Sequence, residues 1–408
     1  MQTCEKTYKR LPAALLVLAM LLSACGNAEE SVASDDESDD PAIEAPAPSE
    51  DEADADAAAE EPVAEEPEAE PVELIYANCG TMQAANTAQT AIPEILGFWE
   101  DENLAVEEVI LAGSGECVQA LDAGNIDVTI TATPSLASPI AQGADNLVAI
   151  GAYVVGNIYT PFVPAESPIE EPADFDGSTI GVGSLEASSV PMFVALLNSV
   201  GLDRDSVDFV PVGFSPGEVS EFLRAGRIDA YAQHDGAQAA LQEVMDMRAV
   251  TNETFENVGF HVIFATRRDV LEEKREALVG LMRGIAKGVV VARENPEAGV
   301  AMLYQQWPEN RPTGVADEDL ISSGLSGLVA RLENIQPVDG LLFNGTREQM
   351  SSHFEVLIAA ETMPALEEPM DSFIDRFWDG SLLEDTNDFD ADQIAEQARS
   401  LVVDDFLQ

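Results

Sequence analysis

The sequence has 408 residues, of which 76 are acidic and 19 basic, and its formal charge at neutral pH is −57. This charge excludes nucleic acid as a partner, and an anionic membrane surface as an electrostatic one, because both need clustered Lys and Arg. Hydrophobic residues make up 46% of the chain, which is enough for a sizeable core, and the length allows two or three domains.

The first 25 residues resemble the export signal of a bacterial lipoprotein. Three basic residues precede an apolar stretch over 11–22, which is shorter than the roughly 20 residues that a transmembrane helix needs. The following Leu-Ser-Ala-Cys-Gly resembles a lipobox, and this resemblance implies that Cys25 carries a lipid anchor in the cell membrane. The alternative is an ordinary secreted protein that is cut near Ala24 and keeps Cys25 as a spare thiol.

Residues 26–72 are predicted to form a disordered linker. Between Glu29 and Glu70 the chain has 19 acidic residues, no Lys or Arg and no aromatic residue. Such a segment cannot bury enough surface to offset its ordering entropy, and its like charges extend it. Another 56 acidic and 16 basic side chains follow Glu70, so the predicted globular part keeps a charge near −40.

From residue 73 the sequence alternates between strand and helix patterns. Strands are expected over 73–78, 106–111 and 127–131, with a helix over 87–99 and another that opens at Gly113. Strands separated by helices of 10–15 residues are typical of parallel βαβ units.

An internal repeat supports two similar α/β units. Residues 121–127 (LDAGNID) recur as 223–229 (LRAGRID), an offset of 102, and a turn with a small residue precedes each copy at matching distance. Gly124 and Gly226 suit the left-handed position that ends a helix. The alternative is that the repeat reflects only common βαβ chemistry.

After residue 266 the sequence is mostly helical. Amphipathic helices are expected over 272–292, 318–332, 347–360, 371–377 and 392–402, where they would cover the first α/β unit.

Seven segments carry a resemblance to a known family: PEILGFWE (93–100) with Asn103-Leu104, GSG (113–115), ALDAGNID (120–127), TPSL (133–136), DFDGSTIGV (174–182), VGL (200–202) and AGRIDA (225–230). In this order they resemble segments of the substrate-binding proteins of bacterial ABC importers for nitrate, sulfonates, taurine and thiamine-type pyrimidine precursors. The resemblance implies an α/β fold of the second periplasmic-binding-protein type, in which two lobes are joined by strands that cross near 158–163 and 262–265. The lobes would be residues 73–160 plus 266–408, and residues 161–265.

The same resemblance implies a function. The protein would be an extracytoplasmic, lipid-anchored, monomeric protein that captures a small organic solute between its lobes. It would deliver the solute to an ABC permease with its ATPase subunits, without a cofactor, a metal or catalysis. Two alternatives remain, a pyrimidine-precursor synthesis enzyme on the same fold and a ligand-sensing clamp.

Solutes in open α/β sheets bind beyond the carboxyl ends of the strands. The candidate serines begin helices, where free N–H groups favour an oxyanion, although each serine could serve only as a helix cap. The candidate ligand residues on these loops are Thr81, Met82, Gln83, Ser114, Gly115, Thr133, Pro134, Ser184, Glu186, Ser188, Ser189, Phe214, Ser215, His234 and Asp235.

Charge narrows the class of solute. Between Val72 and Asp235 the only basic residues are Arg204, Arg224 and Arg227, and none falls on a candidate loop. An aminopyrimidine or a zwitterion such as taurine therefore suits the cleft better than a simple anion, with Glu186 or Asp235 pairing the cationic end. The alternative is that these carboxylates face solvent.

At residues 233–235 the sequence departs from the family, which often has a Trp there. We expect other aromatic residues to line the cleft instead, unless they belong to the core: Tyr76, Tyr153, Tyr159 and Phe214.

Two cysteines, Cys79 and Cys117, follow the signal segment and fall near strand ends that neighbour each other in this fold. In an exported protein they are expected to form a disulfide. The three histidines, His234, His261 and His353, are too scattered in the sequence for a spaced metal site.

Overall fold

The computed structural model describes residues 70–407 except 81, 186, 257 and 312–318. The predicted signal segment, Cys25 and nearly all of the linker lie outside these residues, as do Thr81 and Glu186. The described residues all belong to one compact unit.

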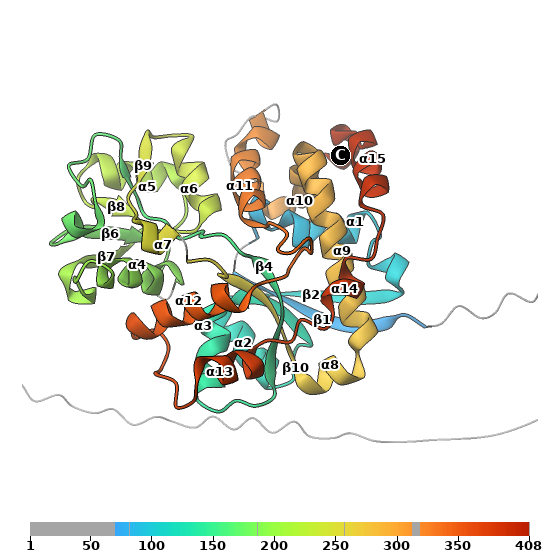
Figure 1. The fold of residues 1–408 in the computed structure, drawn as a ribbon. Helices are drawn as coiled ribbons and strands as arrows, with labels where there is room; N and C mark the ends of the chain where they lie inside the picture. Colours follow the sequence, from blue (N-terminus) through green and yellow to red (C-terminus); the bar gives the residue numbers. More distant parts are fainter. Residues whose placement is uncertain (1–69, 81, 186, 257, 312–318, 408) are drawn as a thin grey trace, which may run out of the picture. The chain divides into compact units, whose positions relative to one another are not determined.

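A five-stranded sheet forms the centre of the first lobe (Figure 1). Its strand order is β2-β1-β3-β10-β4; β1, β2 and β3 are parallel, and β10 is antiparallel to both β3 and β4. The three strands expected from the sequence are present, each shifted or lengthened by one or two residues. Their bounds are β1 Val72–Cys79, β2 Leu104–Leu111, β3 Val128–Ala132, β4 Leu147–Val154 and β10 Val262–Arg267.

The second lobe repeats this arrangement in a smaller sheet. The order β7-β6-β8-β5-β9 again places three parallel strands beside one strand, here β5, that is antiparallel to both of its neighbours, β8 and β9. These strands are only two to four residues long: β5 Phe162–Pro164, β6 Thr179–Val182, β7 Asp208–Pro211, β8 Ala230–Tyr231 and β9 Met247–Ala249.

The internal repeat has a structural cause. Asp127 accepts a hydrogen bond from the backbone N–H of Ile75 (3.0 Å) and donates its own N–H to the Ile75 carbonyl (2.9 Å). Asp229 does the same with Thr179, at 2.8 and 2.7 Å. Gly124 (φ 76°) and Gly226 (φ 62°) end the preceding helices in the left-handed region, where glycine carries little strain. In each lobe the repeated aspartate thus joins the third parallel strand to the first parallel strand, β3 to β1 in one sheet and β8 to β6 in the other.

Helices cover both faces of the first sheet. The expected single helix over 87–99 is wrong, because the chain breaks at Thr90 (ψ −89°) and turns at Gly97 (φ 70°). In its place are η1 Ala84–Gln89, α1 Ala91–Ile95 and η2 Glu100–Glu102. The opposite face carries α2 Ser114–Asp122 and α3 Thr133–Ala141.

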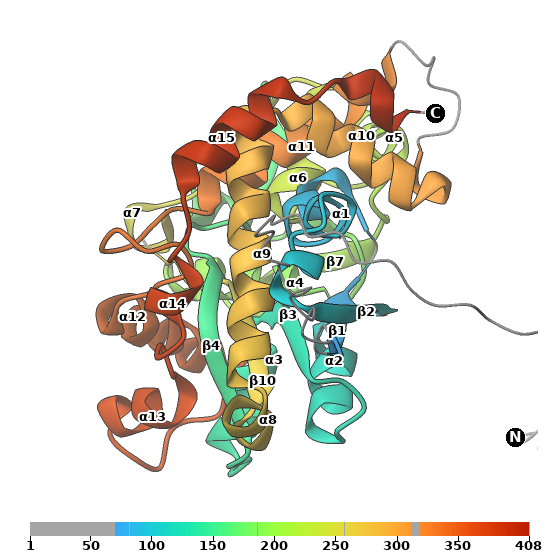
Figure 2. The same ribbon diagram turned by 90° about the vertical axis from the view of Figure 1, so that its right-hand side faces the viewer.

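The long helix α9, which spans Arg275–Glu294, crosses the first sheet on the side of α1 (Figure 2). Glycines permit the close approach, since a Cβ at Gly280 would meet Leu104 and one at Gly284 would meet Trp99. The indole N–H of Trp99 donates to the Leu281 carbonyl at 3.1 Å.

The C-terminal segments are helical, as the sequence predicts, with α10 as an addition that was not expected. The expected helix over 272–292 is divided at Lys274 into α8 and α9. The bounds are α8 Arg268–Glu273, α9 Arg275–Glu294, α10 Pro296–Gln306, η5 Pro308–Asn310, α11 Leu320–Asn334, α12 Arg347–Ala359, α13 Met370–Phe377, α14 Leu383–Thr386, α15 Ala391–Ser400 and η7 Val403–Phe406.

Helices also pack on the second sheet, and two C-terminal helices contact this lobe. Helix α11 lies beside α6, and α12 lies beside α4, where the Asn198 amide donates to the Ala359 carbonyl at 3.0 Å (Figure 1). The second lobe's helices are η3 Pro172–Phe175, α4 Ser189–Asn198, η4 Arg204–Ser206, α5 Pro216–Arg224, α6 Asp235–Gln242 and α7 Glu253–Glu256.

The chain passes between the two sheets twice, over 155–161 and over 250–261. The second passage differs from the expectation, because Val262–Ala265 already belong to β10 of the first sheet. The passages are hydrogen-bonded to each other, from Phe260 N–H to the Val155 carbonyl at 3.1 Å. A Cβ at Gly259 would collide with the same carbonyl. No helix among the described residues is long and apolar enough to cross a membrane.

Candidate functional site

The carboxyl ends of the parallel strands of both sheets bear the loops that hold the candidate ligand residues. In this fold such loops line the cleft between the lobes. Met82 and Gln83 precede η1; Ser114 and Gly115 open α2; Thr133 and Pro134 open α3; Ser184 follows β6; Ser188 and Ser189 begin α4; Phe214 and Ser215 precede α5; His234 and Asp235 begin α6.

In the first lobe, two candidates hold the loops together. The Ser114 hydroxyl oxygen accepts from the backbone N–H of Ala132 at 3.2 Å. The Thr133 hydroxyl donates to the Phe260 carbonyl at 2.5 Å. These bonds tie α2 to β3 and α3 to the second passage, which gives both side chains a structural role. A Cβ at Gly115 would meet no atom within 4 Å, so the backbone there is open to approach.

In the second lobe, serine hydroxyls remain available. Ser188 and Ser215 occupy the N-cap positions of α4 and α5, but neither side chain makes a capping hydrogen bond. The Ser189 hydroxyl is buried and has no hydrogen-bond partner within the described part of the chain. Burial raises the pKa of the Tyr159 hydroxyl, and the Ser188 hydroxyl beside it acts in the opposite direction.

Two rings of the second lobe form an aromatic wall at the interlobe loops. The rings of Phe214 and His234 stack with centroids 6.2 Å apart and an interplanar angle of 29°. Phe214 is 43% exposed, so its ring is accessible to a solute. Beneath it the Gln233 amide nitrogen is buried without a partner among the described residues. A Cβ at Gly183 would collide with both Gln233 and Phe214.

The structure adds a residue that the sequence analysis missed, Arg331 of α11. Its Nε lies 2.9 Å from Oδ2 of Asp235 and its Nη2 lies 2.7 Å from Oδ1. The carboxylate expected to face a cationic solute thus already has a partner from the first lobe. One sequence signal existed: Arg331 falls among the buried positions of α11, between Leu328 and Leu332.

A cavity of about 260 Å³ lies between the lobes beside this ion pair. Its size suits a small solute, since drug-sized ligands need about 300–1,000 Å³. First-lobe segments η1, α10 and α11 line it together with α6 of the second lobe. The lining residues are Met82, Gln83, Ala84, Ala85, Gly236, Ala240, Leu303, Tyr304, Asn310, Ser323, Gly324 and Gly327.

Cys79 and Cys117 form a disulfide, with Cα atoms 6.0 Å apart. Cys79 ends β1, and Cys117 lies in α2 and not at a strand end. The Cys79 sulfur also lies 3.1 Å from the Thr129 hydroxyl. The bond therefore joins α2 to the strand whose end carries the Met82–Gln83 loop.

Three of the four aromatic candidates and two of the histidines belong to the core. Tyr76 and Tyr153 are fully buried, and Tyr159 is 8% exposed. His261 and His353, distant in the sequence, are buried with ring centroids 4.9 Å apart. Burial lowers the pKa of His261 to about 4, so the ring is neutral at physiological pH. Among the described residues, no three His, Cys, Asp or Glu side chains are placed to hold a metal ion.

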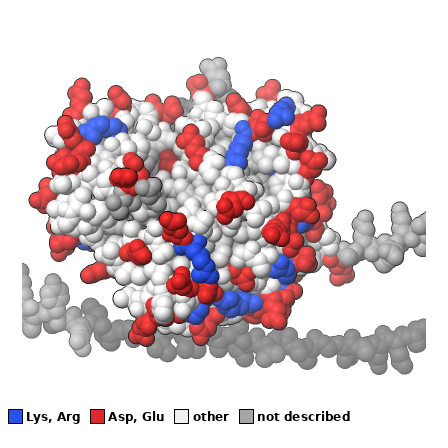
Figure 3. Space-filling model, viewed as in Figure 1, with Lys and Arg blue, Asp and Glu red and all other residues white. Residues whose placement is uncertain are grey.

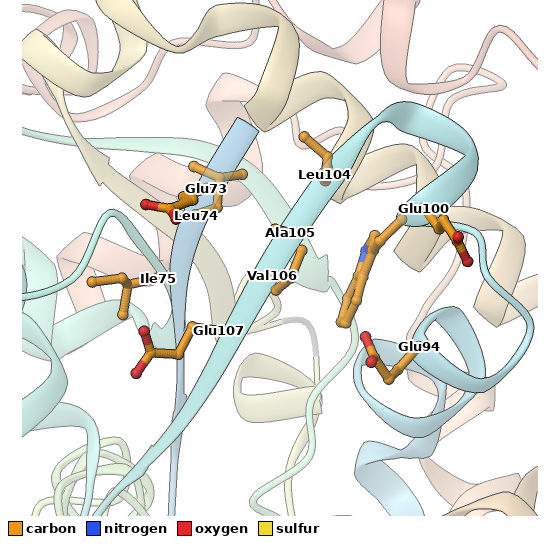
Figure 4. Close-up of a pocket in the computed structure, with 10 residues that line it drawn as sticks. Glu73, Leu74, Ile75, Glu94, Glu100, Leu104, Ala105, Val106 and Glu107 are labelled. Carbon is orange, nitrogen blue, oxygen red and sulfur yellow. The ribbon is translucent and has the colours of Figure 1, made fainter. Parts of the chain in front are cut away.

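A larger cavity, of about 520 Å³, lies away from the interlobe loops at the edge of the first sheet. Figure 4 shows its four carboxylates on opposite sides of β2, with Glu73 and Glu107 on one side and Glu94 and Glu100 on the other. They do not converge on one point. This cavity therefore lacks the arrangement of a cation site.

The three basic residues of the segment 72–235 stay outside the interlobe loops. Arg204 lies over the Phe209 ring, Arg227 lies over the Phe222 ring, and Arg224 donates to the Val244 carbonyl. Acidic side chains are scattered across the face shown in Figure 3 and outnumber the basic ones. Arg331, which α11 brings to Asp235, is a cation at these loops that the segment 72–235 does not contain.

The sequence of this chain is similar to those of known proteins. The family described as NMT1/THI5 like matches residues 85–299. The chain belongs to this family. A relative from Haemophilus influenzae, "Putative thiamine biosynthesis protein", is 28% identical over 134 residues, which are 33% of this chain and 41% of that protein. The alignment thus spans less than half of the relative.

Solved structures share the fold. The periplasmic aliphatic sulphonate binding protein SsuA of Escherichia coli superposes with a TM-score of 0.58 at 18% identity, covering 76% of this chain and 92% of that one. The alkanesulfonate-binding protein SsuA of Xanthomonas axonopodis pv. citri, bound to MOPS, gives 0.54 at 19% identity, covering 73% and 96%. The NMT1/THI5-like chain therefore has the periplasmic-binding-protein fold expected from its sequence.

Proposed function

We propose that the protein captures a small organic solute between its lobes as the binding component of an ABC importer. The observation that carries this proposal is the interlobe cavity, which residues of both lobes line. The fold shared with sulfonate-binding proteins supports a solute-binding role. Closure of such a fold around its ligand gives a permease a surface that it can recognise.

The solute is a small zwitterion of the taurine or sulfonate type, or an aminopyrimidine. The cavity of about 260 Å³ limits its size. The Phe214–His234 wall offers an aromatic face, and the Ser189 hydroxyl and the Gln233 amide offer hydrogen bonds to a polar group. The candidate residues Met82 and Gln83 line the cavity from the first lobe.

The cellular setting is part of the proposal. Cys25 would carry the lipid anchor, the acidic linker would keep the binding unit away from the membrane, and a permease with its ATPase subunits would receive the solute from a monomeric protein. The division into lobes at residues 73–160 plus 266–408 and 161–265 remains a prediction as well, apart from the first-sheet strand over 262–267.

A second candidate is an enzyme of pyrimidine-precursor synthesis, which the name of the Haemophilus influenzae relative favours. Its chemistry would need an accessible nucleophile or base. Cys79 and Cys117 are bonded to each other, and His261 and His353 are buried. Only His234 among these groups lies at the interlobe loops with its side chain partly exposed, at 20%.

A thermal-shift screen tests the proposal. It uses the secreted unit, which is the protein without its predicted signal segment, residues 1–25. Taurine, alkanesulfonates, nitrate, aromatic acids and aminopyrimidines are added in turn, and we expect at least one to raise the unfolding midpoint without being consumed. Ala240→Leu fills the cavity and should abolish the response. Ala239→Leu adds the same volume one position away, outside the cavity lining, and should keep it. A screen without any response, or turnover of the added compound, would contradict the proposal.

A further inference from the structure

A buried ion pair joins the two lobes. Asp235 begins α6 in the second lobe, and Arg331 lies near the end of α11, which packs on the first lobe. Three hydrogen bonds connect them: Nε to Oδ1 (3.1 Å), Nε to Oδ2 (2.9 Å) and Nη2 to Oδ1 (2.7 Å). Each side chain is only 8% exposed.

Both partners keep their charges. Burial alone would raise the pKa of Asp235, but the Arg331 charge and the hydrogen bonds from Arg331 hold it well below its usual range. Burial alone would lower the pKa of Arg331, but Asp235 raises it above its usual value. The pair is therefore a dipole with one full charge in each lobe.

Other groups that face the pair are polar and cannot replace either charge. The Asn334 amide lies 3.4 Å from Asp235 Oδ2, and His234 Nδ1 lies 3.7 Å from Oδ1. The Tyr153 hydroxyl interacts electrostatically with both Asp235 and Arg331. It is fully buried, and within the described part of the chain it has no hydrogen-bond partner.

The pair adjoins the interlobe cavity. Gly236, the residue after Asp235, lines the cavity, and so do Gly324 and Gly327 of α11. Gly324, Gly327 and Arg331 share one helical face, because they follow each other at spacings of three and four. A Cβ at Gly327 would lie 3.4 Å from the Gly236 carbonyl oxygen. The cavity is thus bordered by the residue that follows Asp235 and by the face of α11 that carries Arg331, while the two charged side chains lie behind its lining.

The charges set a condition on the solute. An anion that takes Arg331 would leave Asp235 buried without a partner, and a cation that takes Asp235 would leave Arg331 in the same state. An unpaired buried charge is strongly unfavourable. A solute with one positive and one negative group can separate the pair and satisfy both partners.

We propose that a dipolar solute inserts between Asp235 and Arg331, its cationic group on the carboxylate and its anionic group on the guanidinium, so that this ion pair selects for zwitterions. The inference rests on the proposed solute-binding function and names its substrate class. It also gives the interlobe contact a role, since in the solute-free protein the two residues pair with each other and hold the lobes together at the cavity.

A series of probes matched in size tests the proposal. Taurine and β-alanine carry both charges, ethanesulfonate and propionate only the negative one, and ethylammonium only the positive one. By titration calorimetry on the secreted unit, at least one dipolar probe should bind about tenfold or more tightly than its single-charge analogues, because each analogue leaves one buried charge unpaired.

Two variants should change this preference in opposite directions. In Asp235→Asn the guanidinium has no charged partner, and the affinity ratio of ethanesulfonate to taurine should rise at least about tenfold. In Arg331→Met the ratio of ethylammonium to taurine should rise instead. Arg331→Lys keeps the charge and should keep the preference for taurine. Arg283→Met, which removes a guanidinium paired to Glu102 within the first lobe, should behave as the wild type.

The outcomes separate this inference from the proposed function. If a single-charge probe or an aminopyrimidine binds the wild type more tightly than the dipolar probes, the inference is wrong and the solute-binding proposal stands. The same follows if the two variants keep the wild-type preference. If no probe and no compound of the wider screen binds, both fall. Should Arg331→Met fail to fold, the wild-type series and Asp235→Asn decide.

Discussion

The two lobes share one strand order but differ in what supports it. In each lobe an aspartate is hydrogen-bonded to the first of the three parallel strands and directly precedes the third. Asp127 bonds Ile75 of β1, and Asp229 bonds Thr179 of β6. The first sheet also has the Cys79–Cys117 disulfide and an ion pair between Lys274 and Asp127, and C-terminal helices cover it. The second sheet has strands of only two to four residues. The difference indicates a first lobe built as a support and a second lobe held to it by α11 and α12.

Removing the disulfide of the first lobe should lower the free energy of unfolding more than any of the other changes below. At the repeat offset of 102, Cys117 corresponds to Val219, and both side chains are fully buried. The bond closes a separation of 38 residues, so losing it should lower the free energy of unfolding by about 4 kcal/mol. Cys79→Ser/Cys117→Ser should show this loss in urea titrations, and reductant should shift the wild type alone.

Thiol labelling provides the check on the bond itself. Without reductant the native protein should not react at Cys79 or Cys117, and ready labelling of both would contradict the disulfide. Cys25 must be absent or blocked in that experiment.

Glu108 should give the first lobe a pH dependence that the second sheet lacks. Burial raises the pKa of Glu108 to about 7, although hydrogen bonds from Asn78 and Gln306 act in the opposite direction. In the second sheet the strands carry one carboxylate, the exposed Asp208. Between about pH 4.5 and 7 the folded chain binds more protons here than the unfolded chain, so stability falls as pH rises.

The expected loss from this group is about 3 kcal/mol between pH 4.5 and 8. Glu108→Gln should remove that part of the slope in urea titrations repeated across the range. Glu107→Gln, which replaces an exposed carboxylate on the same strand, should keep the wild-type slope. If both variants titrate like the wild type, the buried carboxyl does not carry the effect.

The matched aspartates should show the smallest difference. Asp127→Ala loses the Ile75 bond and the ion pair with Lys274 at 3.0 Å, so we expect a loss of about 2–3 kcal/mol. Asp229 is exposed and bonds only Thr179 through its side chain, and Asp229→Ala should cost about 1 kcal/mol. Equal losses in urea titrations would mean that Lys274 adds nothing to the first lobe.

Much of the fold could be predicted from local patterns. The offset repeat identified two similar sheets because Asp127 and Asp229 play equivalent parts. The failures have physical reasons: a helix was expected over 87–99 from its apolar spacing, but Thr90 and Gly97 adopt backbone angles that end it. The crossing strand expected over 262–265 lies wholly within the first sheet, between β3 and β4, a pairing that no local pattern records.

The candidate site was predictable only in part. The loops at strand ends follow from the strand order, so Met82, Gln83 and Asp235 could be found. Arg331 could not, because it lies 96 residues from Asp235 and reaches it through tertiary packing of α11. Counting charges along the segment 72–235 therefore underestimated the positive potential of the interlobe loops.

The place of β10 has a consequence for the order in which the chain folds. The second lobe is a continuous insertion between β4 and β10, and β10 lies between β3 and β4 in the first sheet. As a chain emerges from its N-terminus, the second lobe can therefore be complete while β4 still lacks its neighbouring strand. Domains generally fold as units when their last segment becomes available. We expect the smaller, less supported lobe to fold early and the larger one to wait for its C-terminal half.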